Sequence, residues 1–319
     1  MNLRAVFLSL FSFLLIACGE DEPPVPNEAD NFLNQVLTIM EKNSIYKNEI
    51  DWKDFRNQVT KRAEAAKNID ETYPAIQLAL TLLGDNHSVF MKPDGSTIRG
   101  TSSLTCGGEA FSRPILPENI GYIAVKISSG SDNEKMIAYA EEIQKAIKTV
   151  DNENVLGWIV DLRGSGGGNM WPALAGIGPI LGEGIAGYFI DPNDKQTSWG
   201  YSNGASVVNQ TRVVQLLNPY ELINPNPKVA VLYDKGIASS GEAIAIFFIG
   251  RDNTKSFGTP TCGLSTSNSG FNLSNNATLY LTVSYMADRK KQIYGLPVAP
   301  DMESFNQTII QQAIEYIEN

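Results

Sequence analysis

Three separated stretches of the chain carry residue types suited to acyl-transfer chemistry. The first is an elbow at 238–241 (ASSG), between a predicted apolar strand at 229–233 and a predicted apolar helix at about 242–249. A serine at a helix start lies where free backbone N–H groups and the positive end of the helix dipole converge, which favours an oxyanion. The structural alternative is a capping box, because Ser239 and Glu242 also fit S-x-x-E.

His87 is the only histidine in the 319 residues. If an imidazole activates a serine in this chain, that imidazole must therefore belong to His87. The structural alternative is a solvated loop histidine. A zinc site is not expected, because one histidine with scattered carboxylates offers no ligand spacing.

A glycine-rich loop at 164–168 (GSGGG) directly follows a strand predicted at 155–162. It lacks the G-x-G-x-x-G spacing of dinucleotide-binding loops. Glycines after a buried strand let backbone N–H groups point into a cleft, as an oxyanion hole requires. A flexible turn without function is the alternative.

Four segments occur in a characteristic order: LGDNHS at 83–88, DLRGSGGGN at 161–169, ASSGE at 238–242 and GLPVAPD at 295–301. This set resembles the C-terminal-processing, or tail-specific, serine peptidase family, in the branch that includes the tricorn protease core and interphotoreceptor retinoid-binding protein. The similarity spans about residues 31–305. It implies a crotonase-like or ClpP-like spiral of ββα units.

The resemblance also implies roles for individual residues. Ser239 is the implied nucleophile, and the implied oxyanion hole consists of the backbone N–H of Ser240 and one from Gly166 or Gly167. Leu264 stands where relatives with a Ser-Lys dyad carry lysine, so His87 is the expected base.

The acid that would orient His87 is left open among Asp85, Asp301 and Glu303. The segment between 88 and 119 is too short for the PDZ domain that many relatives insert there. The family implies neither a metal nor an organic cofactor.

Apolar residues at helical spacing predict a three-helix unit within 31–84, with Asp51 as an N-cap. The rest of the chain, 85–319, alternates strands with helices and predicts an α/β core. The predicted strands are 119–127, 155–162, 229–233 and 278–285, and the predicted helices are 134–150, 171–181, 242–249 and 309–317.

The N-terminus predicts export. Arg4 precedes an apolar run at 5–17 that ends in LIAC, and this resembles a bacterial lipobox with Cys18 as the lipidated residue. Residues 1–17 would then be the signal peptide and 18–30 a tether. A signal peptide cut elsewhere and a lone membrane anchor are the alternatives. Gly19 and the acids after it favour the outer membrane, on its periplasmic face or at the cell surface.

The formal charge of −10 and a pI near 4.8 argue against a nucleic-acid partner, which needs a basic face. After lipidation, Cys106 and Cys262 remain, either as a disulfide or as two buried thiols.

The sequence thus predicts a lipid-anchored serine endopeptidase acting on peptides or unfolded proteins. The alternative is a non-catalytic module on the same fold that binds a peptide or an apolar small molecule. The two differ in whether the imidazole of His87 lies within hydrogen-bond reach of Ser239 Oγ.

Overall fold

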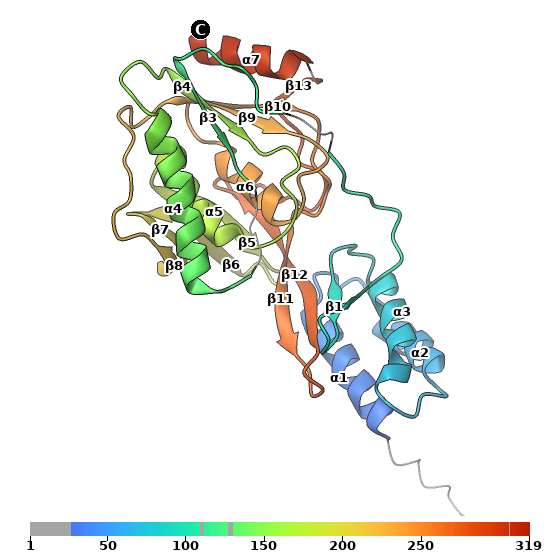
Figure 1. Cartoon of the computed structure of the whole chain (residues 1–319). Coiled ribbons are helices and arrows are strands. Elements are labelled where there is room, and N and C mark those ends of the chain that lie inside the picture. The colour runs from blue at the N-terminus through green and yellow to red at the C-terminus, as the bar shows by residue number, and fades with distance from the viewer. Residues whose placement is uncertain (1–26, 109–111, 127–129, 306) are drawn as a thin grey trace, which may run out of the picture.

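The structure is a computed structural model that describes residues 27–108, 112–126, 130–305 and 307–319. The predicted signal peptide, Cys18 and most of the predicted tether lie outside these residues. A larger α/β core and a smaller helical lobe are visible in Figure 1, joined by the strands that run between them.

The helical lobe contains the three predicted helices. Apolar residues at helical spacing form their buried faces, and Asp51 caps the second helix by accepting from the backbone N–H groups of Lys53 and Asp54, as predicted. The first helix begins within the segment expected to be a tether. The helices are α1 (Glu28–Asn43), α2 (Trp52–Arg62) and α3 (Tyr73–Leu83), with a 3₁₀ turn η1 (Asp70–Thr72) before the third.

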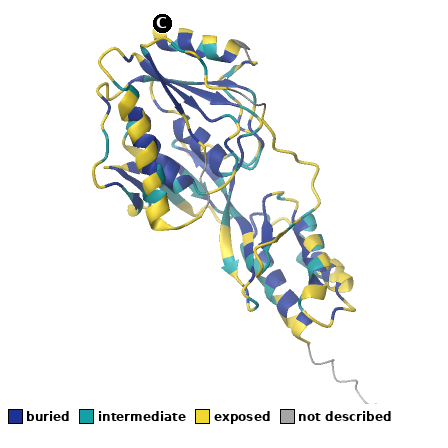
Figure 2. Ribbon diagram, viewed as in Figure 1, coloured by how far each residue is buried: buried dark blue, intermediate teal, exposed yellow. Residues whose placement is uncertain are grey.

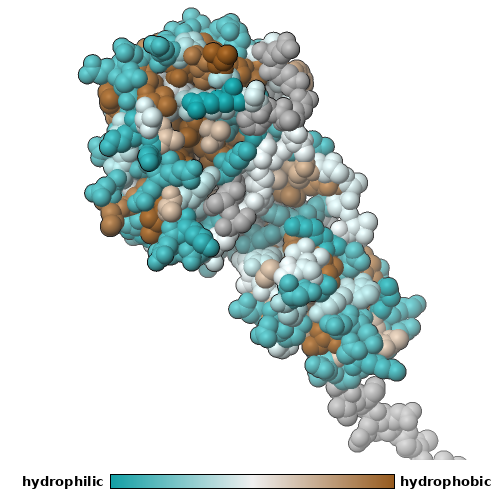
Figure 3. All heavy atoms as spheres, in the orientation of Figure 1, coloured by the Kyte–Doolittle hydropathy of each residue, from teal (hydrophilic) through white to brown (hydrophobic). Residues whose placement is uncertain are grey.

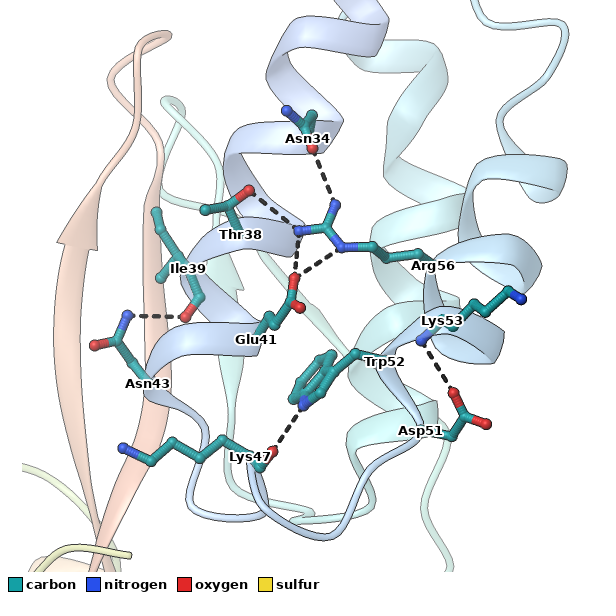
Figure 4. A network of polar contacts seen from close by, with 10 residues as sticks. All are labelled: Asn34, Thr38, Ile39, Glu41, Asn43, Lys47, Asp51, Trp52, Lys53 and Arg56. Atoms are coloured by element: carbon teal, nitrogen blue, oxygen red, sulfur yellow. Dashed lines mark hydrogen bonds and ion pairs between the residues drawn. The ribbon is translucent and has the colours of Figure 1, made fainter. Parts of the chain in front are cut away.

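A polar network ties α2 to α1 (Figure 4). The guanidinium of Arg56 donates twice to one oxygen of Glu41, at 2.8 and 2.6 Å. The same guanidinium also donates to Asn34 Oδ1 and to Thr38 Oγ1. Four hydrogen bonds donated by one planar guanidinium thus link the two helices.

The lobe shares its hydrophobic core with strands from the distal part of the chain. Phe90, Leu273, Leu279 and Leu281 are buried in one cluster with residues of all three helices. The domain boundary predicted after residue 84 therefore divides residues that share one hydrophobic core. The strands involved are β1 (Val89–Met91), β2 (Thr97–Arg99), β11 (Thr266–Asn272) and β12 (Thr278–Asp288).

A five-stranded parallel sheet forms one layer of the α/β core, in the order β13-β10-β9-β4-β3. Its central strands read as continuous apolar runs because both faces are covered (Figure 2). The helix α7 (Gln307–Glu318) packs on one face. The strands are β3 (Ile120–Ala124), β4 (Gly157–Asp161), β9 (Lys228–Tyr233), β10 (Thr254–Gly258) and β13 (Met302–Glu303).

The second sheet is antiparallel, in the order β2-β1-β12-β5-β6-β7-β8, with β11 also paired to β12. The strands β5 (Gly184–Ile190), β6 (Gln196–Ser202), β7 (Ala205–Val208) and β8 (Thr211–Gln215) were not predicted.

Two helices fill the space between the two sheets. The rings of Trp199 and Phe247 pack against each other there, with 4.8 Å between their centroids. These helices are α5 (Met170–Leu181) and α6 (Ser240–Phe248), and α4 (Asn133–Val150) packs beside α5. The predicted α/β core preceded by a three-helix unit is confirmed.

The face of the molecule shown in Figure 3 is mostly hydrophilic on the helical lobe and carries apolar patches on the core. Among the helices in the described ranges, none combines the length and apolar character needed to span a bilayer.

Candidate active site

The candidate site lies where two neighbouring parallel strands end. Strands β4 and β9 pair with each other, and each is followed by one of the loops singled out in the sequence. Loops that follow the carboxyl ends of parallel strands converge at one edge of the sheet, where α/β proteins commonly bind ligands. The glycine loop and the serine elbow are therefore neighbours although they are far apart in the chain.

Ser239 adopts a strained backbone conformation. Its φ of 53° and ψ of −117° lie in a region that non-glycine residues rarely occupy, and such a conformation costs on the order of 1–3 kcal/mol. The turn before it is fixed by Asp234, whose Oδ1 accepts from the backbone N–H groups of Gly236 and Gly164. One carboxylate thus joins the elbow to the glycine loop, and the strain presents the Ser239 side chain at the mouth of α6.

His87 follows α3, which ends at the left-handed Gly84. The carboxylate of Asp85 accepts from the backbone N–H groups of His87 and Ser88, and the Asn268 amide donates to the His87 carbonyl. These bonds hold the backbone of a loop residue in place. The ring then reaches across the cleft, and His87 Nε2 lies 2.8 Å from Ser239 Oγ.

The imidazole of His87 is buried, with 7% of the residue exposed. Burial penalises the charged ring and lowers its pKa to about 4, an effect that Asp85 opposes and Arg99 reinforces. The ring is therefore neutral at physiological pH. A neutral imidazole in contact with a serine hydroxyl is the protonation state that a general base requires.

The other ring nitrogen, Nδ1, meets the hydroxyl of Thr266 at 2.7 Å. None of the three carboxylates named as candidates for orienting the ring is the hydrogen-bond partner of Nδ1. Asp85 accepts from its own turn and from Ser88 Oγ, Asp301 accepts from the backbone and hydroxyl of Ser256, and Glu303 is exposed on β13. Among the described residues, the hydrogen-bond partner of Nδ1 is thus a hydroxyl, because the strand β11 and not a carboxylate passes beside the ring.

The glycine loop packs directly against the elbow. Ala238 N–H donates to the carbonyl of Ser165, and a Cβ placed on Gly241 would come within 1.9 Å of that same oxygen. A Cβ on Gly167 would lie 3.3 Å from Ser239 Cβ. The absence of side chains at these glycines lets the two loops approach closely.

The hydroxyl of Ser240 is bound to the Gly168 carbonyl at 2.7 Å, so this side chain fixes the loop and does not compete as a nucleophile. Its backbone N–H belongs to the first residue of α6, where helix N–H groups have no intrahelical acceptor. The predicted oxyanion residues Gly166, Gly167 and Ser240 all line the same cleft as Ser239.

Glu242 has no exposed surface and holds the elbow to the loop at 261–264. Its Oε2 accepts from the N–H groups of Ser239 and Leu264, and its Oε1 from Gly263 N–H and Thr261 Oγ1. The predicted capping interaction of Glu242 with Ser239 is thus one of four bonds. The S-x-x-E pattern signalled this residue as a cap only, and no sequence signal indicated Thr266.

Cys106 and Cys262 form a disulfide with a Cα–Cα distance of 5.2 Å, which settles the alternative that the sequence left open. The bridge fixes the segment before residue 109 to the loop that Glu242 holds. Cys106, Gly107 and Gly108 consequently form part of the wall of the cleft.

The cleft around Ser239 has a volume of about 1170 Å³. Its wall includes apolar side chains from helices α4 and α5 and from strands β5 and β12, namely Met136, Trp171, Phe189 and Met286. Of the described residues that line it, none is a lysine, and Leu264 lies in the wall. Over the residues that the structure describes, no group of three or more His, Cys, Asp or Glu side chains is arranged to hold a metal ion.

Comparison with known proteins gives a family match over the part of the chain that carries the glycine loop and Ser239. The family model described as Peptidase family S41 matches residues 119–304, more than half of the chain. The match includes the glycine loop and Ser239 and begins after His87, so the placement of the histidine rests on the contacts described above.

Individual relatives cover nearly the whole chain. A nisin-resistance protein from Lactococcus lactis subsp. lactis is 25% identical over 296 residues, which span 92% of this chain and 89% of the relative. The structure of a lipoprotein from Streptococcus agalactiae has a TM-score of 0.73 at 22% identity, covering 93% of this chain and 99% of the other. The photosystem II D1 C-terminal processing protease has a TM-score of 0.57 at 15% identity, covering 91% and 97%. These likenesses of structure extend the shared fold to the helical lobe.

Proposed function

Because the chain belongs to peptidase family S41, we propose that it is a serine endopeptidase that works through an acyl-enzyme, with Ser239 as nucleophile and His87 as base. The observation that carries this proposal is the 2.8 Å contact between His87 Nε2 and Ser239 Oγ. The contact favours catalysis over a non-catalytic binding module, which would not need the pair to meet. The leucine at 264 assigns the base to histidine, since leucine cannot accept a proton.

The reaction follows from the positions of these groups. Ser239 Oγ attacks the scissile carbonyl carbon while its proton passes to His87 Nε2. The developing oxyanion is stabilised by backbone N–H groups of Ser240 and of Gly166 or Gly167. His87 then gives the proton to the leaving amine, and a water molecule releases the acyl group by the reverse sequence.

The substrate is a peptide or an unfolded protein segment. A cleft of about 1170 Å³ with an apolar wall and an exposed glycine loop is suited to an extended chain with apolar side chains. The Lactococcus relative is named for nisin resistance, which makes nisin a first peptide to test.

Lipid attachment at Cys18 would place the enzyme in the cell envelope. The similarity to a streptococcal lipoprotein supports this part of the proposal, and Gly19 with the acidic residues after it favours the outer membrane. Mass spectrometry of the mature N-terminus and membrane fractionation of a Cys18→Ser variant test it. A mature N-terminus that carries no lipid on Cys18 would refute anchoring through Cys18.

The central test compares Ser239→Ala and the unchanged protein against a library of unstructured peptides and a serine-reactive fluorophosphonate probe. We expect hydrolysis and labelling by the unchanged protein and neither by the variant. Ser269→Ala, at an exposed position of β11 outside the wall of the cleft, is the matched control, and we expect it to keep the labelling reaction. Hydrolysis that persists in Ser239→Ala would refute the assignment of the nucleophile.

A further inference from the structure

We propose that Thr266 is the positioning residue of this site and that its hydroxyl orients His87 where a triad enzyme would use a carboxylate. This inference rests on the proposed function for the tautomer of His87 and for its kinetic consequence. The contact itself is a property of the folded chain.

The geometry that carries the inference is a chain of three side chains. Ser239 Oγ, the two ring nitrogens of His87 and Thr266 Oγ1 are linked by contacts of 2.8 and 2.7 Å. Thr266 is 7% exposed and is the first residue of β11. A side chain on a paired strand has little freedom, so it can define the angle of the imidazole ring.

The proposed base role of His87 requires one tautomer of this contact. A neutral imidazole carries its proton on one nitrogen only, and a base that accepts from Ser239 must leave Nε2 unprotonated. The proton then lies on Nδ1 and is donated to Thr266 Oγ1. Thr266 also lines the cleft, which leaves its own hydroxyl proton free to point there.

The charged groups that act on the ring belong to other elements. Asp85, in the turn before the ring, favours the protonated imidazole, and Arg99 on β2 opposes it. The Asp85 oxygens are already occupied by the N–H groups of His87 and Ser88 and by the Ser88 hydroxyl. Orientation and charge are therefore supplied by different residues, with Thr266 providing orientation and Asp85 providing charge.

During acylation the serine proton moves to Nε2 while the Nδ1 proton stays in place, so the ring becomes an imidazolium held by Thr266. A neutral hydroxyl stabilises this cation less than a carboxylate does, because a hydrogen bond with an ionised acceptor is roughly twice as strong. Compared with a carboxylate, the Thr266 hydroxyl therefore stabilises the imidazolium less, and the imidazole stays neutral in mildly acidic solution.

The first test uses the fact that His87 is the only histidine, so its ring nitrogens give one unambiguous pair of ¹⁵N signals. In the unchanged protein at neutral pH we expect the proton on Nδ1. In Thr266→Val, which removes the hydroxyl at nearly constant volume, we expect the Nε2-protonated tautomer to become populated. A proton on Nε2 in the unchanged protein would overturn the proposal whether or not the chain hydrolyses peptides.

The second test is kinetic. We expect Thr266→Val to lower kcat about 10- to 100-fold with little change in KM, which corresponds to leaving one buried polar group unpaired. Thr266→Ser should restore activity to within about threefold, because it returns the hydroxyl. Thr278→Val is the matched control, since Thr278 lies on the neighbouring strand β12 far from the ring.

The outcomes separate the two proposals. Equal kcat in Thr266→Val and the unchanged protein would refute the positioning role and leave the peptidase proposal intact. An unchanged protein that shows the Nδ1 proton but neither hydrolysis nor probe labelling would refute the peptidase proposal and support the positioning contact alone.

Discussion

Replacing Glu242 by glutamine should be unusually costly for so small a change. The carboxylate is fully buried and accepts from four donors, two on each oxygen. An amide keeps one accepting oxygen and turns the other position into an NH₂ group. In either orientation the NH₂ group faces two groups that had donated to the carboxylate.

The magnitude follows from the orientation that costs less. If the NH₂ replaces Oε2, it faces the N–H groups of Ser239 and Leu264, which are both donors. If it replaces Oε1, it faces Gly263 N–H and the Thr261 hydroxyl, which can rotate. In this second orientation the Thr261 hydroxyl accepts from the NH₂, so only Gly263 N–H loses its bond, while the other three bonds become bonds to a neutral amide. Hydrogen bonds to a charged group are worth about 1.5–3 kcal/mol each and neutral ones about 1 kcal/mol, so one lost bond and three weakened ones amount to roughly 3–6 kcal/mol. Relief from burying a charge offsets part of this, and we expect a net loss of about 2–4 kcal/mol.

The assay is urea unfolding followed by tryptophan fluorescence, together with kcat for peptide hydrolysis. We expect the urea concentration at the unfolding midpoint to fall, while the dependence of the free energy of unfolding on urea concentration stays unchanged. We also expect kcat to fall at least about tenfold, because the loop at 261–264 leads into Thr266. Glu118→Gln, at an exposed position, is the control and should change stability by less than about 0.5 kcal/mol. A loss below about 1 kcal/mol in Glu242→Gln would show that the buried carboxylate does not hold these segments together.

Two further predictions concern pH and the disulfide. Because burial lowers the pKa of His87 to about 4, the acid limb of kcat/KM should have its midpoint near pH 4 and not near 6.5. The same shift means that the folded state binds fewer protons than the unfolded state between these pH values. The contribution of His87 to the free energy of unfolding is therefore fully present above pH 6.5, and the free energy of unfolding falls by about 3 kcal/mol as the pH decreases to 4. A His87→Gln variant should lose this component, and an identical pH profile of unfolding in the two proteins would contradict it. Replacing both Cys106 and Cys262 by serine removes a disulfide between residues 156 positions apart in the sequence, and it should lower the free energy of unfolding by up to about 5 kcal/mol. Urea unfolding of the pair variant measures this, and a midpoint equal to that of the oxidised protein would refute a stabilising role.

Local patterns in the sequence were sufficient to predict most helices and the buried parallel strands. The helical spacing of apolar residues and the N-cap at Asp51 depend on neighbours within one or two turns, and the structure confirms both. The strands at 184–215 were not predicted, because short half-exposed strands carry only a weak apolar pattern. Such strands are stabilised by packing against their neighbours in the sheet, and a local sequence pattern does not contain that information.

The sequence by itself determined which residue types were available for chemistry. With one histidine and no lysine at 264, it limited the candidates for the base of Ser239 to His87. The tertiary structure decided which groups meet. His87 and Ser239 are 152 residues apart, and Thr266 reaches the imidazole only because β11 crosses from the core toward the helical lobe. Contacts of this kind depend on how two sheets and a lobe pack against one another, and no periodicity within a short window encodes that arrangement.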